Sequence, residues 1–325
     1  MSGTVWLVEN RAHKSFHRCT LLMLLLWLSG LPGVKGQSTD WQVQTGDWNT
    51  ASNWSNGVAD SLTSATIDNG GSALVLGSAS ASSVALGFFG DGTVIVNGAS
   101  STLTTPGYIQ AGAFGTGRLT VENGGAVRVD GYLQMGLLPD SDGTTMVTGT
   151  GSSLVVLGDI VAGGSGTGRL AITNGGVATG GGNVEIGFES GGNGTILVSG
   201  SGSRLTSDHV LYVGYLGTGS LTVADGAIVQ VGGGAGLLTV GSQPGSIGTL
   251  NIGNRNSAGT VRAREISGGD GLARVNFNES DQNYIFSIPL TGSLIVAQNG
   301  PWKTLPWTLL LVDLERLISI LRRFT

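Results

Sequence analysis

The chain has 325 residues, of which 58 are glycine and only 7 proline, and charged residues make up 11%. Plentiful valine, isoleucine and leucine exclude a charged disordered chain, and collagen is excluded because glycine does not occupy every third position. The formal net charge of −5 argues against a nucleic-acid partner, which would need a clustered basic surface. The composition therefore favours short β-strands joined by glycine-rich turns.

Residues 1–36 have the order of a secretory signal peptide. A basic stretch precedes the apolar run 21–28, and Leu-Pro-Gly at 31–33 breaks the expected signal helix before cleavage near Gly36. A single anchoring helix is the alternative, but the apolar run is about half of the roughly 20 residues that a span needs. Cys19 is the only cysteine and lies within this segment, so the mature chain would have no disulfide.

Residues 37–83 are predicted to form an N-terminal cap and the first strands. The stretch 40–57 contains three of the seven tryptophans, Trp41, Trp48 and Trp54. We interpret them as an end cap of the core, because a repetitive fold must cover its ends. A ligand-stacking surface is the alternative.

Residues 84–255 repeat with a period of about 25 residues. One glycine opens the same strand in successive units, and we use it as a ruler: Gly92, Gly117, Gly143, Gly168, Gly194, Gly219 and Gly248. The positions two and four residues later are apolar in every unit except at Thr145, whereas the position between them is mixed. This alternation predicts strands that cover a core with one face.

Two further signals recur in each unit. Asn-Gly or Asp-Gly pairs, which tolerate positive φ, follow the first strand at 97–98, 123–124, 174–175 and 225–226. An apolar-x-apolar-Gly pattern predicts a second strand at 84–87, 109–112, 133–136, 160–163, 184–187, 211–214 and 238–241.

A sandwich or barrel of antiparallel hairpins would not require the same residue at the same place in every unit. A coil of three strands does, because each strand pairs in parallel with its counterpart one turn later and equivalent side chains stack. We therefore predict an all-β fold, a right-handed parallel β-helix of about seven to eight coils of ~25 residues.

The end of the chain departs from this pattern. Residues 256–300 are predicted to form degenerate final coils, and residues 301–325 form a glycine-free, helical tail. Three interpretations of the tail are open: a frame change near residue 301, a helical cap over the last coil, or a membrane-associating helix. The first would make the chain a fragment of a longer protein.

Gly46, Trp48, Asn53 and Trp54, followed by Ala-Thr-Ile at 65–67, resemble the start of bacterial autotransporter (type V secretion) passenger domains. The repeated GTGxLTVxxGG units resemble the adhesin-like class of these passengers, and the resemblance covers about residues 40–301. It implies a secreted, cell-surface or outer-membrane location in a Gram-negative bacterium and an association with virulence. It also implies membrane contact only through a C-terminal barrel, which would be missing or separate here. The implied partners are host-surface or matrix molecules, or like passengers on neighbouring cells.

Residues that could carry chemistry are few. His209, beside Asp208, is the one histidine after the signal segment, so zinc, triad and thiol chemistries lack their residues. Asp140 and Asp142 are the closest acidic pair and carry the rival hypothesis, a polysaccharide-acting enzyme. GFFGDG at 87–92 is a lone near-match to a calcium repeat and reads better as a turn.

Arg118 and Arg169 occupy equal positions two units apart, with Ser220 next in that column. Solvated outward residues are the first interpretation, and an adhesive stripe is the second. We predict no catalytic, cofactor-binding or metal-binding residues and no cofactor. The predicted function is a non-enzymatic, adhesin-like passenger. The alternatives are a polysaccharide-acting enzyme and a truncated remnant without present activity.

Overall fold

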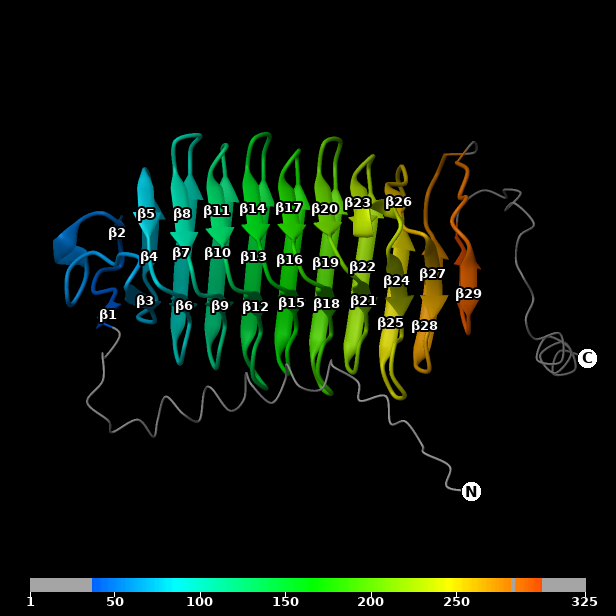
Figure 1. Ribbon diagram of the computed structural model, residues 1–325, viewed down its shortest axis with the longest axis horizontal. Helices are drawn as coiled ribbons and strands as arrows, with labels where there is room; N and C mark the ends of the chain where they lie inside the picture. Colours follow the sequence, from blue (N-terminus) through cyan, green and yellow to red (C-terminus); the bar gives the residue numbers. More distant parts are fainter. Residues whose placement is uncertain (1–36, 282–283, 300–325) are drawn as a thin grey trace, which may run out of the picture. The chain divides into compact units, whose positions relative to one another are not determined.

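The computed structural model describes residues 37–281 and 284–299, which form a parallel β-solenoid (Figure 1). The predicted signal helix and the predicted helical tail lie outside these residues. Within the described residues the only helical turns are two short 3₁₀ segments, η1 (Ala51–Asn53) and η2 (Gly232–Gly234). No helix in this part of the chain is long and apolar enough to cross a membrane.

The described residues form three sheets, and each pairing between named strands is parallel. Sheet 1 consists of β1 (Gln37–Asp40), β3 (Thr63–Ile67), β6 (Val84–Leu86), β9 (Ile109–Ala111), β12 (Leu133–Met135), β15 (Ile160–Ala162), β18 (Val184–Ile186), β21 (Leu211–Val213), β24 (Leu237–Val240), β27 (Glu265–Gly268) and β29 (Leu290–Gly292). Sheet 2 consists of β2 (Thr45–Asp47), β4 (Ser72–Val75), β7 (Asp91–Asn97), β10 (Thr116–Glu122), β13 (Asp142–Thr148), β16 (Thr167–Thr173), β19 (Asn193–Ser199), β22 (Thr218–Ala224), β25 (Ile247–Ile252), β28 (Leu272–Phe277) and β30 (Ile295–Gln298). Sheet 3 consists of β5 (Ser78–Ser80), β8 (Thr102–Thr105), β11 (Ala126–Val129), β14 (Ser153–Val156), β17 (Val177–Gly180), β20 (Arg204–Ser207), β23 (Ile228–Val231) and β26 (Thr260–Arg262).

The described solenoid has about ten turns, so the predicted number of seven to eight coils is too low. The additional coils are those in which the sequence repeat is lost. In β28, Ala273 pairs with Gly248 and so occupies the position of the ruler glycine, and β30 pairs with β28 in turn. Parallel pairing thus continues where the sequence no longer marks it.

The ruler glycines form one column of sheet 2, as the period predicted. A Cβ atom on Gly117 would lie 2.1 Å from the backbone nitrogen of Gly112 and 2.3 Å from the carbonyl oxygen of Leu86. Gly112 itself has φ +70°, because the chain turns sharply here from sheet 1 into sheet 2. Glycine is therefore required on both sides of this corner.

The fourteen inward positions of the repeat form the core of the seven coils that carry them. Each is at most 1% exposed: Val94, Val96, Leu119, Val121, Thr145, Val147, Leu170, Ile172, Ile196, Val198, Leu221, Val223, Leu250 and Ile252. Thr145 is fully buried with these residues, and its Oγ1 has no hydrogen-bond partner in the described part of the chain. A buried, unpaired hydroxyl opposes folding by roughly 1–3 kcal/mol.

Three of the four predicted Asn-Gly or Asp-Gly turns have positive φ at both residues, whereas at 97–98 only Gly98 does. Asn123 has φ +53° and Gly124 has φ +87°, and the amide of Gly125 donates to the carbonyl of Glu122 at 3.0 Å. Two successive positive φ values define a type I′ turn, which explains the preference for asparagine and glycine. The buried hydroxyl of Ser152 accepts the Gly124 amide at 3.0 Å, so this turn is fastened to the next coil.

The three N-terminal tryptophans pack against one another within the core. Trp54 lies edge-on to both Trp41 and Trp48, with ring centroids 4.9 and 4.8 Å apart. The indole N–H of Trp54 donates to the carbonyl of Trp48 at 2.7 Å. Because each of the three is at most 4% exposed, no ring face is open to a ligand. Their burial agrees with the end-cap interpretation and contradicts a ligand-stacking surface.

Candidate functional site

Arg118 and Arg169 share one outward column of sheet 2, as predicted, with Thr144 paired between them. Both side chains are exposed. Arg169 donates to the Asp142 carboxylate of the preceding coil at 2.6 Å. These positions are therefore solvated strand residues, and Arg169 is already paired.

The acidic pair Asp140 and Asp142 lies at the start of β13. Asp140 is exposed in a turn with φ +67°, and Asp142 is engaged by Arg169. Neither residue lines the cavity described below. The residues next to Asp142 in the sequence include no cationic side chain, but the fold places the guanidinium of Arg169 beside its carboxylate.

The remaining predicted candidates are surface turns. Asp208 and His209 are both exposed in the turn after β20, as expected of a surface feature. In the stretch 87–92, Phe89 is 70% exposed and stacks on Phe114 at a centroid distance of 5.1 Å. Within the part of the chain that the structure describes, no three His, Cys, Asp or Glu residues gather to hold a metal ion.

An outward column of sheet 1, which we call the polar column, is unexpectedly buried. It runs through Gln110, Gln134, Val161, Glu185, Tyr212 and Thr239, which pair in register from β9 to β24. Stacked rings flank it: Tyr108 on Tyr132 at 5.2 Å, and Phe188 on Tyr215 at 5.4 Å. Large side chains from neighbouring coils therefore shield polar groups that point away from the core.

Glu185 is the acidic residue of this column, and it is 8% exposed. Burial, with a smaller contribution from the charge of Asp159, raises the pKa of Glu185 from 4.5 to about 8. Its Oε1 accepts only a long contact of 3.5 Å from the Asn183 amide. The carboxyl is therefore protonated near neutral pH and can donate a hydrogen bond.

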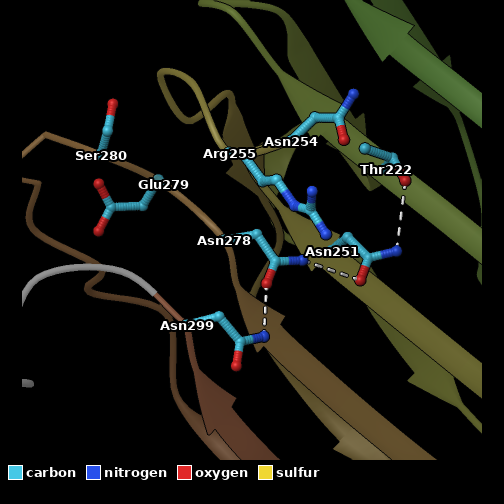
Figure 2. A pocket seen from close by; sticks show the side chains of 9 residues that line it. Thr222, Asn251, Asn254, Arg255, Asn278, Glu279, Ser280 and Asn299 are labelled. Carbon is cyan, nitrogen blue, oxygen red and sulfur yellow. Dashed lines mark hydrogen bonds between the residues drawn. The ribbon is translucent and has the colours of Figure 1, made fainter.

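A polar cavity of about 740 Å³ lies beside the last coils (Figure 2). It is lined by Thr222, Asn251, Gly253, Asn254, Arg255, Asn278, Glu279, Ser280 and Asn299. We call it the amide cavity, since four of these residues are asparagines.

An expanded turn forms one wall of the amide cavity. Val223 pairs with Ile252, and Ile228 pairs with Thr260, so the four residues between the paired positions in one coil become seven in the next. The three added residues push the turn that carries Asn254 and Arg255 out of the regular contour. The cavity thus arises where the coil departs from its repeat.

A chain of side-chain hydrogen bonds forms the floor of the cavity. Asn251 donates to the hydroxyl of Thr222 at 3.3 Å, Asn278 donates to Asn251 at 3.4 Å, and Asn299 donates to Asn278 at 2.7 Å (Figure 2). Asn276 also donates to Asn251, at 2.9 Å. Asn251 and Asn278 each use both the amide nitrogen and the amide oxygen in these bonds, which fixes the orientation of the two side chains.

The two charged residues of the cavity face different ways. Arg255 is exposed, and Figure 2 shows its side chain extending from the expanded turn toward the asparagines. Glu279 is 2% exposed, and its carboxylate is turned away from Arg255 in the same view. The cavity therefore presents a positive charge among neutral amides and hydroxyls.

The sequence analysis did not single out Glu185 or any residue of the amide cavity. The residues paired with Glu185 in the sheet, Val161 and Tyr212, come from the two adjacent coils and are distant from it in the sequence. The signal that could have located the cavity is the cluster of asparagines at 251, 254, 256, 276 and 278, at the place where the repeat changes length.

No family model matches the chain. It is 29% identical over 228 residues to an adhesin autotransporter, BmaC, of Brucella suis biovar 1 (strain 1330), which covers 66% of this chain and 6% of that protein. It is 28% identical over 205 residues to the uncharacterized protein YuaQ of Escherichia coli (strain K12), covering 59% of this chain and 14% of that protein. The chain thus spans only a small part of the relatives that it matches.

Among solved structures, the chain is similar to a hyper-glycosylated TibA fragment (residues 55–350 of that protein), with a TM-score of 0.35 and 17% identity over 83% of this chain and 97% of the other. The match to the adhesin autotransporter confirms the resemblance to autotransporter passengers that the sequence predicted.

Proposed function

We propose that this solenoid, which resembles part of an autotransporter adhesin, is an exported, non-catalytic passenger that binds other surfaces. It would be secreted or held at the surface of a Gram-negative bacterium, and a signal peptide would direct its export. Its partners would be host-surface or matrix molecules, or like passengers on neighbouring cells. The solenoid would be right-handed, because connections between parallel strands of one sheet are usually right-handed.

The observation that carries this proposal is the in-register stacking of sheet 2, whose outward side chains form long parallel columns. The column of Arg118 and Arg169 continues through Thr93, Thr144, Thr195, Ser220, Thr249 and Arg274. Such columns offer the same shallow contact many times, and linked weak contacts bind much more tightly together than singly. The name of the BmaC relative, an adhesin, supports the same use.

The rival function, cleavage of polysaccharide by Asp140 and Asp142, is less well supported. Asp142 is paired with Arg169 on an exposed strand end, and a general acid would need a shielded carboxyl instead. Glu185 is such a carboxyl, but rings and neighbouring coils cover its column. We therefore favour binding over cleavage.

The proposal is tested with beads coated with the full chain. We expect them to adhere to epithelial monolayers, to matrix-coated wells or to one another several-fold more than albumin-coated beads. Equal adherence of both kinds of bead on every surface would contradict the proposal. Release of reducing ends from polysaccharides, abolished by the double substitution Asp140→Asn and Asp142→Asn, would establish the rival instead.

A further inference from the structure

We propose that the amide cavity binds an acidic saccharide, that is, a sugar unit carrying a carboxylate, with Arg255 receiving the carboxylate. The inference rests on the proposed function, because it assigns a ligand class to a surface meant for binding. It is carried by the polarity of the cavity, by the state of its unpaired groups, and by its size.

The polarity of the cavity selects a ligand rich in hydroxyl groups. Its lining has asparagine amides, the hydroxyls of Thr222 and Ser280, and no aromatic or aliphatic side chain other than that of Thr222. A ligand that enters must replace the water bonds of the lining with its own. Sugar hydroxyls both donate and accept, as amides do, so they can satisfy such a lining from either side.

Two side chains of the expanded turn are available for this purpose. Within the described residues, neither the amide of Asn254 nor the guanidinium of Arg255 forms a hydrogen bond or ion pair with another side chain. The three ion pairs found in this part of the chain involve other arginines, such as Arg169 with Asp142. An unpaired guanidinium at the edge of a cavity is suited to bidentate binding of a carboxylate.

The backbone holds Arg255 in place. Its φ of +66° lies in the left-handed region, which is uncommon for residues other than glycine. Its amide donates to the carbonyl of Asn278 at 2.6 Å, and the amide of Ser280 donates to the carbonyl of Asn256 at 2.9 Å. The expanded turn is therefore tied to the opposite wall of the cavity, which fixes the backbone from which the side chain of Arg255 extends.

The size of the cavity fits one or two sugar units. Its volume of about 740 Å³ lies within the range of about 300–1,000 Å³ that is usual for small-ligand sites. The turned-away carboxylate of Glu279 leaves Arg255 as the charge that a ligand meets first, so a sugar acid is favoured over its neutral counterpart.

The test compares two sugars that differ in one group. Glucuronic acid and glucose are titrated into the full chain by calorimetry at low salt, with and without the substitution Arg255→Gly. Glycine adopts φ of +66° without strain, so this variant removes the guanidinium and keeps the fold. The matched control is Arg128→Ala, which removes an exposed arginine from sheet 3 of a regular coil, away from both the cavity and the outward column of sheet 2.

We expect glucuronic acid to bind at least about tenfold more tightly than glucose, as a charge-assisted bidentate contact allows. Arg255→Gly should abolish this difference, and Arg128→Ala should leave it unchanged. Substitution Asn254→Ala should weaken both sugars alike, because it removes a hydrogen bond and no charge. Equal affinity of the two sugars, no binding of either, or an unchanged preference in the Arg255→Gly variant would overturn the inference.

The sugar titration tests the cavity assignment and the bead assay tests the adhesin proposal, so failure of one can be told from failure of the other. Beads that adhere while the chain binds no sugar acid would contradict the cavity assignment and leave the adhesin proposal standing. Sugar binding by a chain whose beads do not adhere would support the cavity and contradict the adhesin.

Discussion

The regular coils and the last coils use the same strands and the same pairing register but differ at their turns. Between Val223 and Ile228 the chain follows the repeat, and the outer contour of the solenoid stays closed. Between Ile252 and Thr260 three more residues separate the strands, and the amide cavity lies beneath the longer turn. Parallel pairing thus maintains the scaffold while turns are free to change, which is where binding residues usually lie.

The same comparison applies to the ruler column. Gly117 stands against the backbone of Gly112 and Leu86, whereas the later coil has Ala273 at the equivalent place. Regular coils therefore require glycine at this position, whereas the later coil accommodates the Cβ atom of an alanine. The first prediction tests this difference directly.

Substitution Gly117→Val should have the largest effect on stability. Two side-chain methyls cannot be placed where a single Cβ would already lie 2.1 Å from a backbone nitrogen, so the corner must open. We expect a loss of more than about 3 kcal/mol in the free energy of unfolding, measured by denaturant titration. The control is Ala273→Gly, which should cost only about 1 kcal/mol. Similar losses for both variants would contradict the difference between the two regions.

Substitution Glu185→Gln should remove a pH dependence of stability. The pKa of Glu185 is raised to about 8 in the folded state, so between its ordinary value and 8 the folded chain holds a proton that the unfolded chain has lost. The contribution of Glu185 to stability should therefore be greatest below about pH 4.5 and fall by about 1.4 kcal/mol per pH unit as the pH rises toward 8.

The measurement is denaturant unfolding of wild type and variant between about pH 5 and pH 8. Glu185→Gln should flatten the curve, and Glu122→Gln, on the outward face of sheet 2, serves as the matched control. An unchanged slope in Glu185→Gln would show that the polar column is more open to water than its 8% exposure implies.

Much of the regular scaffold could be predicted because each coil repeats the same physical requirement. Gly117 and its equivalents recur at the tight corner, and the inward columns recur beneath it, so one period reveals both. The last coils could not be counted from the sequence, because Ala273 hides the ruler position while backbone pairing continues.

The candidate sites were harder to predict because they depend on neighbours from different coils. Tyr212 and Tyr215, whose rings lie near Glu185, belong to the next coil, and the floor of the cavity joins Asn251, Asn278 and Asn299 from three strand ends. A single unit of sequence contains none of these contacts. They exist only once the coils are stacked.

Substitution Thr145→Val should make the regular coils more stable. Valine has nearly the shape of threonine and lacks the hydroxyl that is buried without a partner in the described residues. We expect a gain of about 1–2 kcal/mol in the free energy of unfolding. Thr120→Val, on the outward side of the neighbouring strand, is the control and should change stability by less than about 0.5 kcal/mol. A loss of stability in Thr145→Val would mean that the hydroxyl is satisfied in solution.

The smallest effect on stability is expected from the exposed ion pair of the regular coils. The pair of Arg169 and Asp142 spans adjacent coils at 2.6 Å, with the two side chains 51% and 38% exposed. A double-mutant cycle with Arg169→Ala and Asp142→Ala should give a coupling of about 0.2–1 kcal/mol, reduced by salt, because water screens such pairs. A larger coupling that persists in high salt would make the outward column of sheet 2 a structural element of the coils. A small coupling would leave the outward column of sheet 2 free for binding. Arginines of both regions would then contact ligands, Arg169 as part of a repeated face and Arg255 beside a single cavity.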